Sequence, residues 1–311
     1  MSIENWKICQ ICGVENPPEN HYYFSHKTSI KNYFEKYFPK HDLFTGEKLL
    51  FKDLESYILN LFLNKNNLKN YIEKKLVTKQ EKIEFCKNLL LQRKNIKNLT
   101  YTFTEVELKS IQSPSVAYLL KLFEDVGGYY KVCEQLGFKN KYIEPKNIIF
   151  KEEDKNKNII IDTRERLFLR IDHSYEIGTI KYGDYSINGK VNIERKNTVD
   201  LISSVSSGNF DRFCREIERC GADNNYLVIL VEEVLSNCLV FNKLPWISKN
   251  IKASPSFIFH NLRFIIQKYP HIQVLFVDGR RESARIVKKL LFNEEIVKNY
   301  DLQLLYNKGV L

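Results

Sequence analysis

The sequence predicts a mixed α/β fold for its carboxy-terminal half, with a sheet flanked by helices. First, segments with strand and helix patterns alternate from about residue 157 onward. Second, the apolar run at 226–231 has the length of a strand buried on both faces. Third, Asn188-Gly189 separates two segments rich in strand-forming residues, which is typical of a hairpin. Alternation of this kind indicates a sheet covered by helices.

The individual elements follow from local patterns. The expected strands cover residues 158–162, 167–171, 177–187, 191–196, 226–234 and 272–277. The expected helices cover residues 198–205, 209–220, 255–268 and 282–292. The polar, lysine-rich segment 151–158 is expected to be an interdomain linker. We therefore assign residues 157–311 to one domain.

The block from residue 51 to 150 is expected to be mostly helical. Apolar residues recur at helical spacing in two runs, 54–62 and 77–91. Within 114–138, Gly127-Gly128 separates two short helical patterns. This segment loosely resembles the helix-turn-helix pieces of mobile-element endonucleases, which would present residues 129–131 to a DNA groove. An ordinary helical hairpin explains the pattern equally well.

The first 50 residues predict a small zinc-binding module. Cys9 and Cys12 have the spacing of a zinc knuckle, and His21 and His26 are spaced so that both imidazoles can reach one ion. His41 is an alternative to either histidine. Such a zinc ion would be structural, because the block is too small to bury a core of its own. The alternative is two core thiols and unrelated surface histidines.

Composition and charge favour a nucleic-acid partner. The chain has 311 residues, with 48 Lys and Arg against 38 Asp and Glu, a net charge of +10. Part of this excess is also what a lysine-rich coding bias would produce. No apolar run approaches the roughly 18 residues of a membrane helix, and the start lacks an export signal. Seven scattered cysteines indicate a reducing compartment, so we expect a soluble cytoplasmic protein.

Three polar side chains near the predicted hairpin form the most informative motif. Residues two apart in a strand share a face, so Glu194 and Lys196 project together and Arg195 projects away. A two-residue turn at Asn188-Gly189 would put Asp184 on the face opposite Glu194. A three-residue loop at 187–189, with Gly189 left-handed, pairs 186 with 190 and returns Asp184 to that face. We expect this longer loop or an equivalent bulge.

The chemistry of this group is that of a divalent metal site. Two neighbouring carboxylates repel each other unless a hard cation lies between them, and Mg²⁺ prefers carboxylate oxygens. A lysine beside them can stabilise charge that develops on a phosphate, which predicts metal-assisted phosphodiester hydrolysis. Asp162 and Glu165 are further acidic candidates, and Asp200 is either a ligand or a helix cap. The alternative is a set of surface ion pairs on a hairpin.

The order of motifs resembles a known family. IIIDTRE, GDY, IERKNTVDL, RFCREIER and a strand ending in VEE are similar to the nuclease domain of XPF-type structure-specific endonucleases. The resemblance covers about residues 157–295 and implies the restriction-endonuclease-like PD-(D/E)XK fold. It implies that Mg²⁺ or Mn²⁺ is bound by Asp184 and Glu194, with Asp162 as a further ligand. It also implies that Lys196 assists the water, and that Glu165 and Asp200 complete the acidic cluster.

Five arginines are the expected DNA contacts. Three of them, Arg212, Arg215 and Arg219, recur on one face of the helix expected at 209–220. The alternative for these three is ion pairing with Glu216 and Glu218 on the same helix. The other two expected contacts are Arg164 and Arg195, within the family motifs.

The resemblance also bears on domain organisation. XPF-type nucleases commonly carry tandem helix-hairpin-helix modules after the nuclease domain and pair through both. Leu311 follows the last expected helix closely, which leaves no room for such a module. We therefore expect that DNA targeting lies in the amino-terminal blocks, and that a homodimer would form through the nuclease domain.

The sequence thus predicts a metal-dependent DNA endonuclease of DNA repair or recombination. Its substrate is branched DNA, such as flaps and forks, or a specific site. Two alternatives remain at this level. One is a catalytically silent DNA-binding or scaffold protein with a nuclease fold. The other is a homing-type endonuclease of a mobile element.

Overall fold

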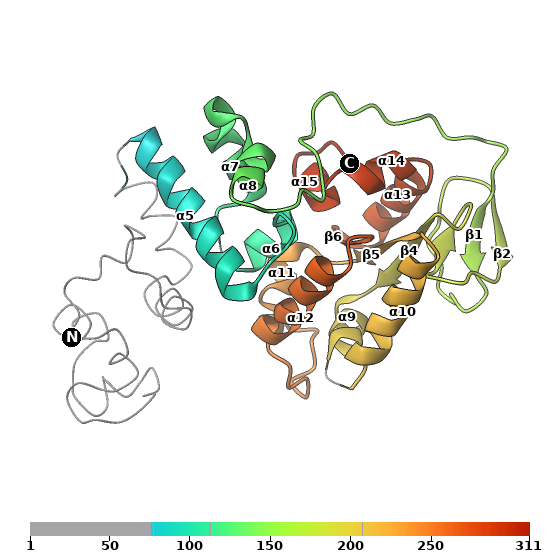
Figure 1. The fold of residues 1–311 in the computed structure, drawn as a ribbon. Coiled ribbons are helices and arrows are strands. Elements are labelled where there is room, and N and C mark those ends of the chain that lie inside the picture. The colour runs from blue at the N-terminus through green and yellow to red at the C-terminus, as the bar shows by residue number, and fades with distance from the viewer. Residues whose placement is uncertain (1–75, 77, 112, 207) are drawn as a thin grey trace. The chain divides into compact units, whose positions relative to one another are not determined.

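The structure is a computed structural model that describes residues 76, 78–111, 113–206 and 208–311 (Figure 1). The chain divides into two compact units, residues 1–99 and 100–311. In the described part of the first unit, α5 (Lys79–Lys97) begins at a capping box of Thr78 and Glu81. It ends at Asn98, whose φ is +49°. The predicted zinc ligands Cys9, Cys12, His21, His26 and His41 lie outside the described residues.

The second unit is built on a six-stranded mixed sheet with the order β2-β1-β3-β4-β5-β6. The strands are β1 (Ile159–Asp162), β2 (Tyr175–Gly178), β3 (Tyr185–Ser186), β4 (Val191–Lys196), β5 (Tyr226–Val231) and β6 (Ile272–Phe276). The β3 strand pairs antiparallel with β1 and β4, and the remaining neighbours pair parallel. The predicted mixed α/β fold is therefore confirmed.

Helices cover both faces of this sheet (Figure 1). One face packs against α9 (Thr198–Val205), α10 (Phe210–Ala222) and α12 (Pro255–Lys268). The other packs against α13 (Gly279–Leu291), α14 (Glu294–Asn299) and α15 (Leu302–Asn307). Between β5 and α12 lie α11 (Leu235–Cys238) and the 3₁₀ turn η3 (Phe241–Lys243). Neighbouring residues of β5 point to opposite cores, Ile229 to the first and Leu230 to the second.

The helices that precede the sheet in sequence belong to the same compact unit. They are α6 (Glu105–Ser110), α7 (Val116–Leu122), the 3₁₀ turn η2 (Glu124–Val126) and α8 (Tyr129–Gln135). The N–H of Glu105 donates to Asp301 Oδ2 at 2.6 Å, at the start of α15. Lys141 Nζ donates to the carbonyls of Ile266 and Ile272, at 3.2 and 3.0 Å. Buried polar contacts thus join residues 100–145 to the sheet domain.

Two side chains expected to face a DNA groove are buried. Tyr129 is fully buried and its hydroxyl donates to Phe103 O at 3.0 Å, and Tyr130 packs edge-on against Tyr129. The expectation that these tyrosines reach DNA is therefore wrong. The glycine pair Gly127-Gly128 has positive φ at both residues, which ends one helix and starts the next.

The segment 167–171 is a loop and not the expected strand. Leu169 and Ile171 are buried, which produced the alternating pattern, but the backbone makes no ladder. Leu169 N donates to the Tyr185 hydroxyl at 2.9 Å, and the carbonyl of Leu167 accepts from arginine side chains distant in sequence. In this loop, side chains rather than a neighbouring strand supply the hydrogen-bond partners of the backbone N–H and C=O groups.

The β3–β4 hairpin has a longer loop than expected. Ser186 lies opposite Asn192, two residues beyond the predicted partner 190. Gly189 has a φ of +76°, as expected for the left-handed position. The loop is held by side chains, since Gly189 N donates to Ser186 Oγ and Asn192 Nδ2 donates to Gly189 O. A shift of two residues preserves the face, so Asp184 and Glu194 remain on the same side.

No described helix has both the length and the apolar character needed to cross a membrane.

Candidate active site

The predicted site lies at the carboxyl ends of two parallel strands. Lys196 is the last residue of β4, and Glu232 directly follows β5. The N–H of Glu232 donates to the carbonyl of Lys196 at 2.9 Å, which continues the ladder to this edge. Asp184 immediately precedes β3, the other neighbour of β4. The sheet therefore brings Asp184, Glu194 and Lys196 together.

The backbone of Asp184 is held between two strands. Its N–H donates to Ile193 O at 2.8 Å, and its carbonyl accepts from Asp162 N at 2.9 Å. Gly183 before it has a φ of +72°, and a Cβ at that position would lie 2.8 Å from Ile193 O. Only glycine permits both this dihedral and this approach. The GD pair therefore sets the position of the Asp184 carboxylate.

The Asp184 carboxyl is in an unfavourable environment for a negative charge. Burial, and next the neighbouring Glu194 carboxylate, raise its pKa to about 7. Glu165 acts in the same direction. A hydrogen bond of 2.8 Å from Arg195 N to Oδ2 opposes the shift, as does Lys196. The Asp184 carboxyl thus lies in a largely buried position beside a second carboxylate.

Lys196 is positioned on the same face by a buried stem. The residue is 8% exposed, and its Nζ lies 2.9 Å from Glu194 Oε1. The same Nζ lies 5.1 Å from the centroid of the Phe213 ring on α10. This distance is within the range of a cation–π contact. The ammonium group is therefore fixed beside the carboxylate pair.

Arg195 lies on the opposite face, as the strand period predicts. Its Nη1 donates to Glu165 Oε1 at 3.0 Å and to Leu167 O at 2.7 Å. Its Nη2 donates to Glu232 Oε2 at 3.0 Å. The Arg195 side chain is only 13% exposed, so the structure binds it between two carboxylates. Glu232 was not among the predicted site residues, although it stands in the VEE segment of the motif.

Asp162 differs from Asp184 because protein donors already surround it. Arg164 Nε and N donate to Oδ1 at 2.6 and 2.8 Å, and Ile180 N donates to Oδ2 at 2.9 Å. The Arg164 side chain is the main reason why the pKa of Asp162 is lowered to about 2. Asp162 therefore anchors the 162–165 turn at the edge of the site.

Asp200 lies in the exposed first turn of α9 and is not its N-cap. The cap is Asn197, whose Oδ1 accepts from Asp200 N at 3.0 Å. The Asp200 carboxylate follows Lys196 by four residues and is free to face solvent.

The three arginines of α10 are exposed, and their helix is amphipathic as predicted. Phe213 and Ile217 are buried against the sheet, while Arg212, Arg215 and Arg219 face solvent. Arg212 Nε lies 4.0 Å from Glu216 Oε1, a long contact for an exposed pair. The carbonyl of Arg219 accepts from the Tyr182 hydroxyl at 3.0 Å. This bond ties α10 to the loop that leads to Asp184.

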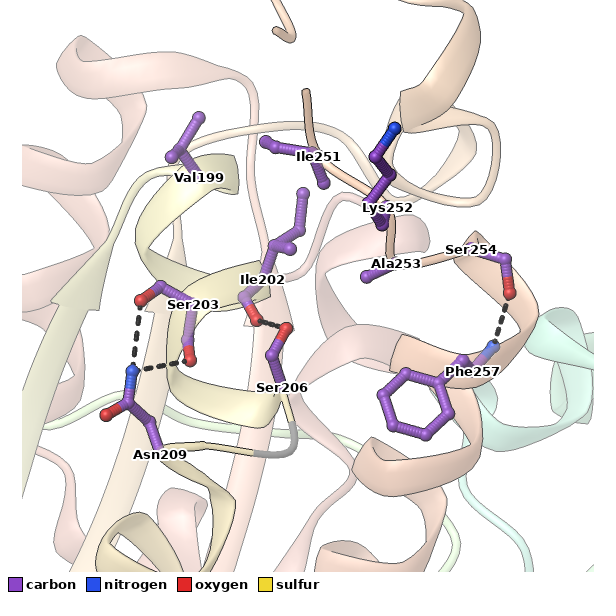
Figure 2. Close-up of a pocket in the computed structure, with 10 residues that line it drawn as sticks. All are labelled: Val199, Ile202, Ser203, Ser206, Asn209, Ile251, Lys252, Ala253, Ser254 and Phe257. Carbon is purple, nitrogen blue, oxygen red and sulfur yellow. Dashed lines mark hydrogen bonds between the residues drawn. The ribbon is translucent and has the colours of Figure 1, made fainter. Parts of the chain in front are cut away.

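An open groove of about 680 Å³ runs beside α9, the helix that follows Lys196. Figure 2 shows its mixed lining, with apolar Val199, Ile202 and Phe257 and the hydroxyls of Ser203 and Ser206. The hydroxyl of Ser206 donates to Ile202 O at 2.6 Å. The groove is therefore a surface with both apolar and hydrogen-bonding character.

The donor set at Asp184 and Glu194 fits a hard divalent cation. Carboxylate oxygens are the ligands that Mg²⁺ and Mn²⁺ prefer, and a cation would relieve the repulsion that raises the pKa of Asp184. Among the described residues, no cluster of three or more His, Cys, Asp or Glu side chains has the arrangement of a complete metal site. Water and substrate oxygens commonly complete the coordination of Mg²⁺.

Comparison with known proteins agrees with the motif. Residues 161–290 match the ERCC4 domain family. The chain is 24% identical over 151 residues to the DNA repair endonuclease UVH1 of Arabidopsis thaliana. That match covers 47% of this chain and 15% of the relative. The predicted resemblance of the carboxy-terminal domain to XPF-type nucleases is confirmed.

Two solved structures of XPF from Aeropyrum pernix are also similar. The first is 15% identical with a TM-score of 0.34, and covers 43% of this chain and 64% of that one. The second, a complex with DNA, is 14% identical with a TM-score of 0.33, and covers 50% of this chain and 66% of that one.

Proposed function

We propose that the chain is a metal-dependent DNA endonuclease whose active site is formed by Asp184, Glu194 and Lys196. The observation that carries the proposal is the register of β3 and β4, which puts Asp184 on the face of Glu194 and Lys196, with Lys196 Nζ 2.9 Å from Glu194 Oε1. Burial, and next Glu194, also raise the pKa of Asp184 to about 7, as expected for a partly buried carboxyl beside a second carboxylate. The ERCC4 match over residues 161–290 supports the same assignment.

Each side chain of the proposed site has a distinct role in the cleavage reaction. Asp184 and Glu194 would hold Mg²⁺ or Mn²⁺, which supplies Lewis-acid activation of the attacking water and of the phosphate oxygens. Lys196 donates to the negative charge that grows on the phosphate in the transition state. The backbone N–H of Arg195 orients the Asp184 carboxylate through its bond to Oδ2. Glu165 and Asp200 are proposed as further acidic groups of this centre, and Asp162 fixes the turn that carries Glu165.

The proposed substrate is DNA. The chain carries a net charge of +10, and Arg212, Arg215 and Arg219 form an exposed basic face on α10. The relative from Arabidopsis thaliana is a DNA repair endonuclease, which favours a role in repair. We further propose that the amino-terminal blocks, with a structural zinc ion at Cys9 and Cys12, select the DNA structure or sequence. Pairing of two chains through the nuclease domain would permit double-strand cutting.

A cleavage assay tests the proposal. Linear, flap, fork and Holliday DNA are incubated with the full chain and Mg²⁺, and products are mapped. Asp184→Asn and Lys196→Met should each slow cutting by at least about 100-fold, because each removes a group that acts on the transition state. DNA affinity measured in Ca²⁺ should stay within about threefold of wild type.

The matched control is Asp172→Asn, which removes the charge of an exposed aspartate in the loop before β2. It should cut like wild type. If the wild-type chain binds these DNAs but cuts none of them in Mg²⁺ or Mn²⁺, the chain is a silent DNA-binding protein. Cutting by Asp184→Asn at the wild-type rate would remove this site from the reaction.

A further inference from the structure

The loop after β1 begins next to Asp184, because the N–H of Asp162, the last residue of β1, donates to Asp184 O at 2.9 Å, and this loop exposes an apolar side chain. We name residues 163–170 the arginine loop, because Arg164, Arg166 and Arg170 are all exposed in it. Leu167 at its centre is 72% exposed, whereas Phe168 is half-buried and Leu169 is buried. A single exposed leucine is ordinary on a protein surface. Leu167 differs because its backbone is held firmly on several sides.

Side chains from three other elements fix this backbone. The carbonyl of Leu167 accepts from Arg195 Nη1 at 2.7 Å and from Arg280 Nη2 at 2.6 Å. Arg280 Nη2 also donates to Phe168 O at 2.7 Å. Leu169 N donates to the Tyr185 hydroxyl at 2.9 Å. The loop therefore presents Leu167 in one conformation, which lowers the entropy that a partner must overcome on binding.

The same bonds connect Leu167 to the proposed metal ligands. Arg195 donates through its guanidinium to Leu167 O and through its backbone N–H to Asp184 Oδ2. One residue thus contacts both the loop and a proposed metal carboxylate. The loop and the Asp184 carboxylate are therefore joined through Arg195 at one edge of the sheet.

The charge around Leu167 identifies the chemistry of that partner. Arg166 and Arg170 are exposed and have no ion-pair partner among the residues that the structure describes. Glu165, the single acidic residue of the loop, is already bound to Arg195. A leucine between unpaired arginines suits a polyanion whose apolar groups lie between its phosphates. Nucleic acid has this arrangement, and leucine is one of the apolar residues that proteins insert between base steps.

We propose that the arginine loop is a DNA-contacting element, in which Leu167 inserts against the bases next to the cut and Arg166 and Arg170 bind the flanking phosphates. This inference rests on the proposed function, because it places the cut strand at Asp184. It assigns to Leu167 the unstacking of one base step at the active site. That local distortion would favour junctions and flaps, where unstacking costs least.

The test uses the full chain and a flap DNA with 2-aminopurine at the base step next to the mapped cut, or next to the branch point if no cut is found. Binding in Ca²⁺ should raise 2-aminopurine fluorescence for wild type and for Asp184→Asn, the variant that is expected not to cleave DNA. Leu167→Ala should abolish that rise and slow cutting about tenfold, while Leu167→Phe should retain both. The double variant Arg166→Gln, Arg170→Gln should make the slope of log affinity against log salt concentration less steep by about 2, because two phosphate contacts are lost.

The control is Ile149→Ala, which truncates a residue that is 84% exposed outside the arginine loop. It should match wild type in fluorescence and cutting. A Leu167→Ala variant that keeps both the fluorescence rise and the cutting rate overturns the inference. If no variant cuts but the rise depends on Leu167, the loop assignment stands and the nuclease proposal fails. If wild-type binding gives no rise, the loop assignment fails whether or not DNA is cut.

Discussion

The backbone N–H of Arg195 donates a 2.8 Å hydrogen bond to Oδ2 of Asp184. The Arg195 side chain leaves the strand on the opposite face and binds Glu165 and Glu232. One residue therefore supports the site in two independent ways. A change of its side chain leaves the backbone donor in place, so the two contributions are separable by mutation.

Arg195→Lys should lower the cutting rate by about 10- to 100-fold. Lysine keeps the charge but lacks the planar fork that contacts Glu165, Glu232 and Leu167 together. The Mg²⁺ concentration that gives half-maximal cutting should change little, because the amide bond to Asp184 remains. Arg281→Lys, at an exposed position in the first turn of α13, is the control. Wild-type cutting by Arg195→Lys would show that these side-chain contacts do not position the site.

Gly183→Ala should both destabilise the fold and slow cutting. The matched variant is Gly189→Ala, since the two glycines have φ values of +72° and +76°. A Cβ at 183 would lie 2.8 Å from Ile193 O, whereas nothing lies within 4 Å of one at 189. Gly183→Ala should therefore lose about 1–3 kcal/mol more unfolding free energy in urea than Gly189→Ala. Equal losses would mean that the contact with β4 is not limiting.

Because of Asp301, the free energy of unfolding should fall as the pH rises from about 4 to 7. Burial raises the pKa of this carboxyl from 3.8 to about 7, so the folded state binds its proton more tightly than the unfolded state. Its stabilising effect is complete below about pH 4 and is lost as the pH passes 7. The thermal midpoint of wild type minus that of Asp301→Asn should therefore be more positive at pH 5 than at pH 8, by at least about 2 °C. A constant difference would contradict the raised pKa.

Truncation should show whether residues 100–145 belong to the cooperatively folding unit of the sheet domain. A fragment of residues 100–311 keeps the bonds from Glu105 to Asp301 and from Lys141 to α12, and should unfold in one cooperative transition. A fragment of residues 146–311 loses these partners and also loses Val106, which is buried in the same hydrophobic cluster as residues of α12. We expect a lower midpoint and a broader transition in urea. Identical curves for both fragments would show that residues 100–145 add no stability.

Local signals in the sequence predicted several elements to within a residue. The expected helices 198–205 and 255–268 agree with α9 and α12, because Asn197 and Ser254 cap them and Pro255 fits the first turn. β5 covers Tyr226–Val231 and so ends three residues before the expected strand 226–234. The loop at 167–171 was not predictable in this way. Its backbone is satisfied by Arg195, Arg280 and Tyr185, and no local pattern encodes contacts that distant.

The candidate site was predictable to the same extent. The strand period placed Glu194 and Lys196 together, and parity placed Asp184 on their face even though the loop length was wrong. Glu232 can bind the Arg195 side chain only because β5 lies next to β4, and the order of strands in the sheet cannot be read from local sequence patterns. The contrast between Asp162 and Asp184 is also tertiary, because it depends on which carboxylate Arg164 and Ile180 reach.

The bond from Tyr182 to α10 has a mechanical consequence. The Tyr182 hydroxyl lies 3.0 Å from Arg219 O and 2.8 Å from Asp223 Oδ2, so its single proton is shared between these acceptors, and Lys181 also pairs with Asp223. These bonds join the carboxyl end of α10 to the segment 181–184, which ends at Asp184. If α10 binds a phosphate backbone as proposed, a shift of this helix would reach the proposed metal ligand Asp184 through two residues, which would couple DNA binding to the geometry of the site.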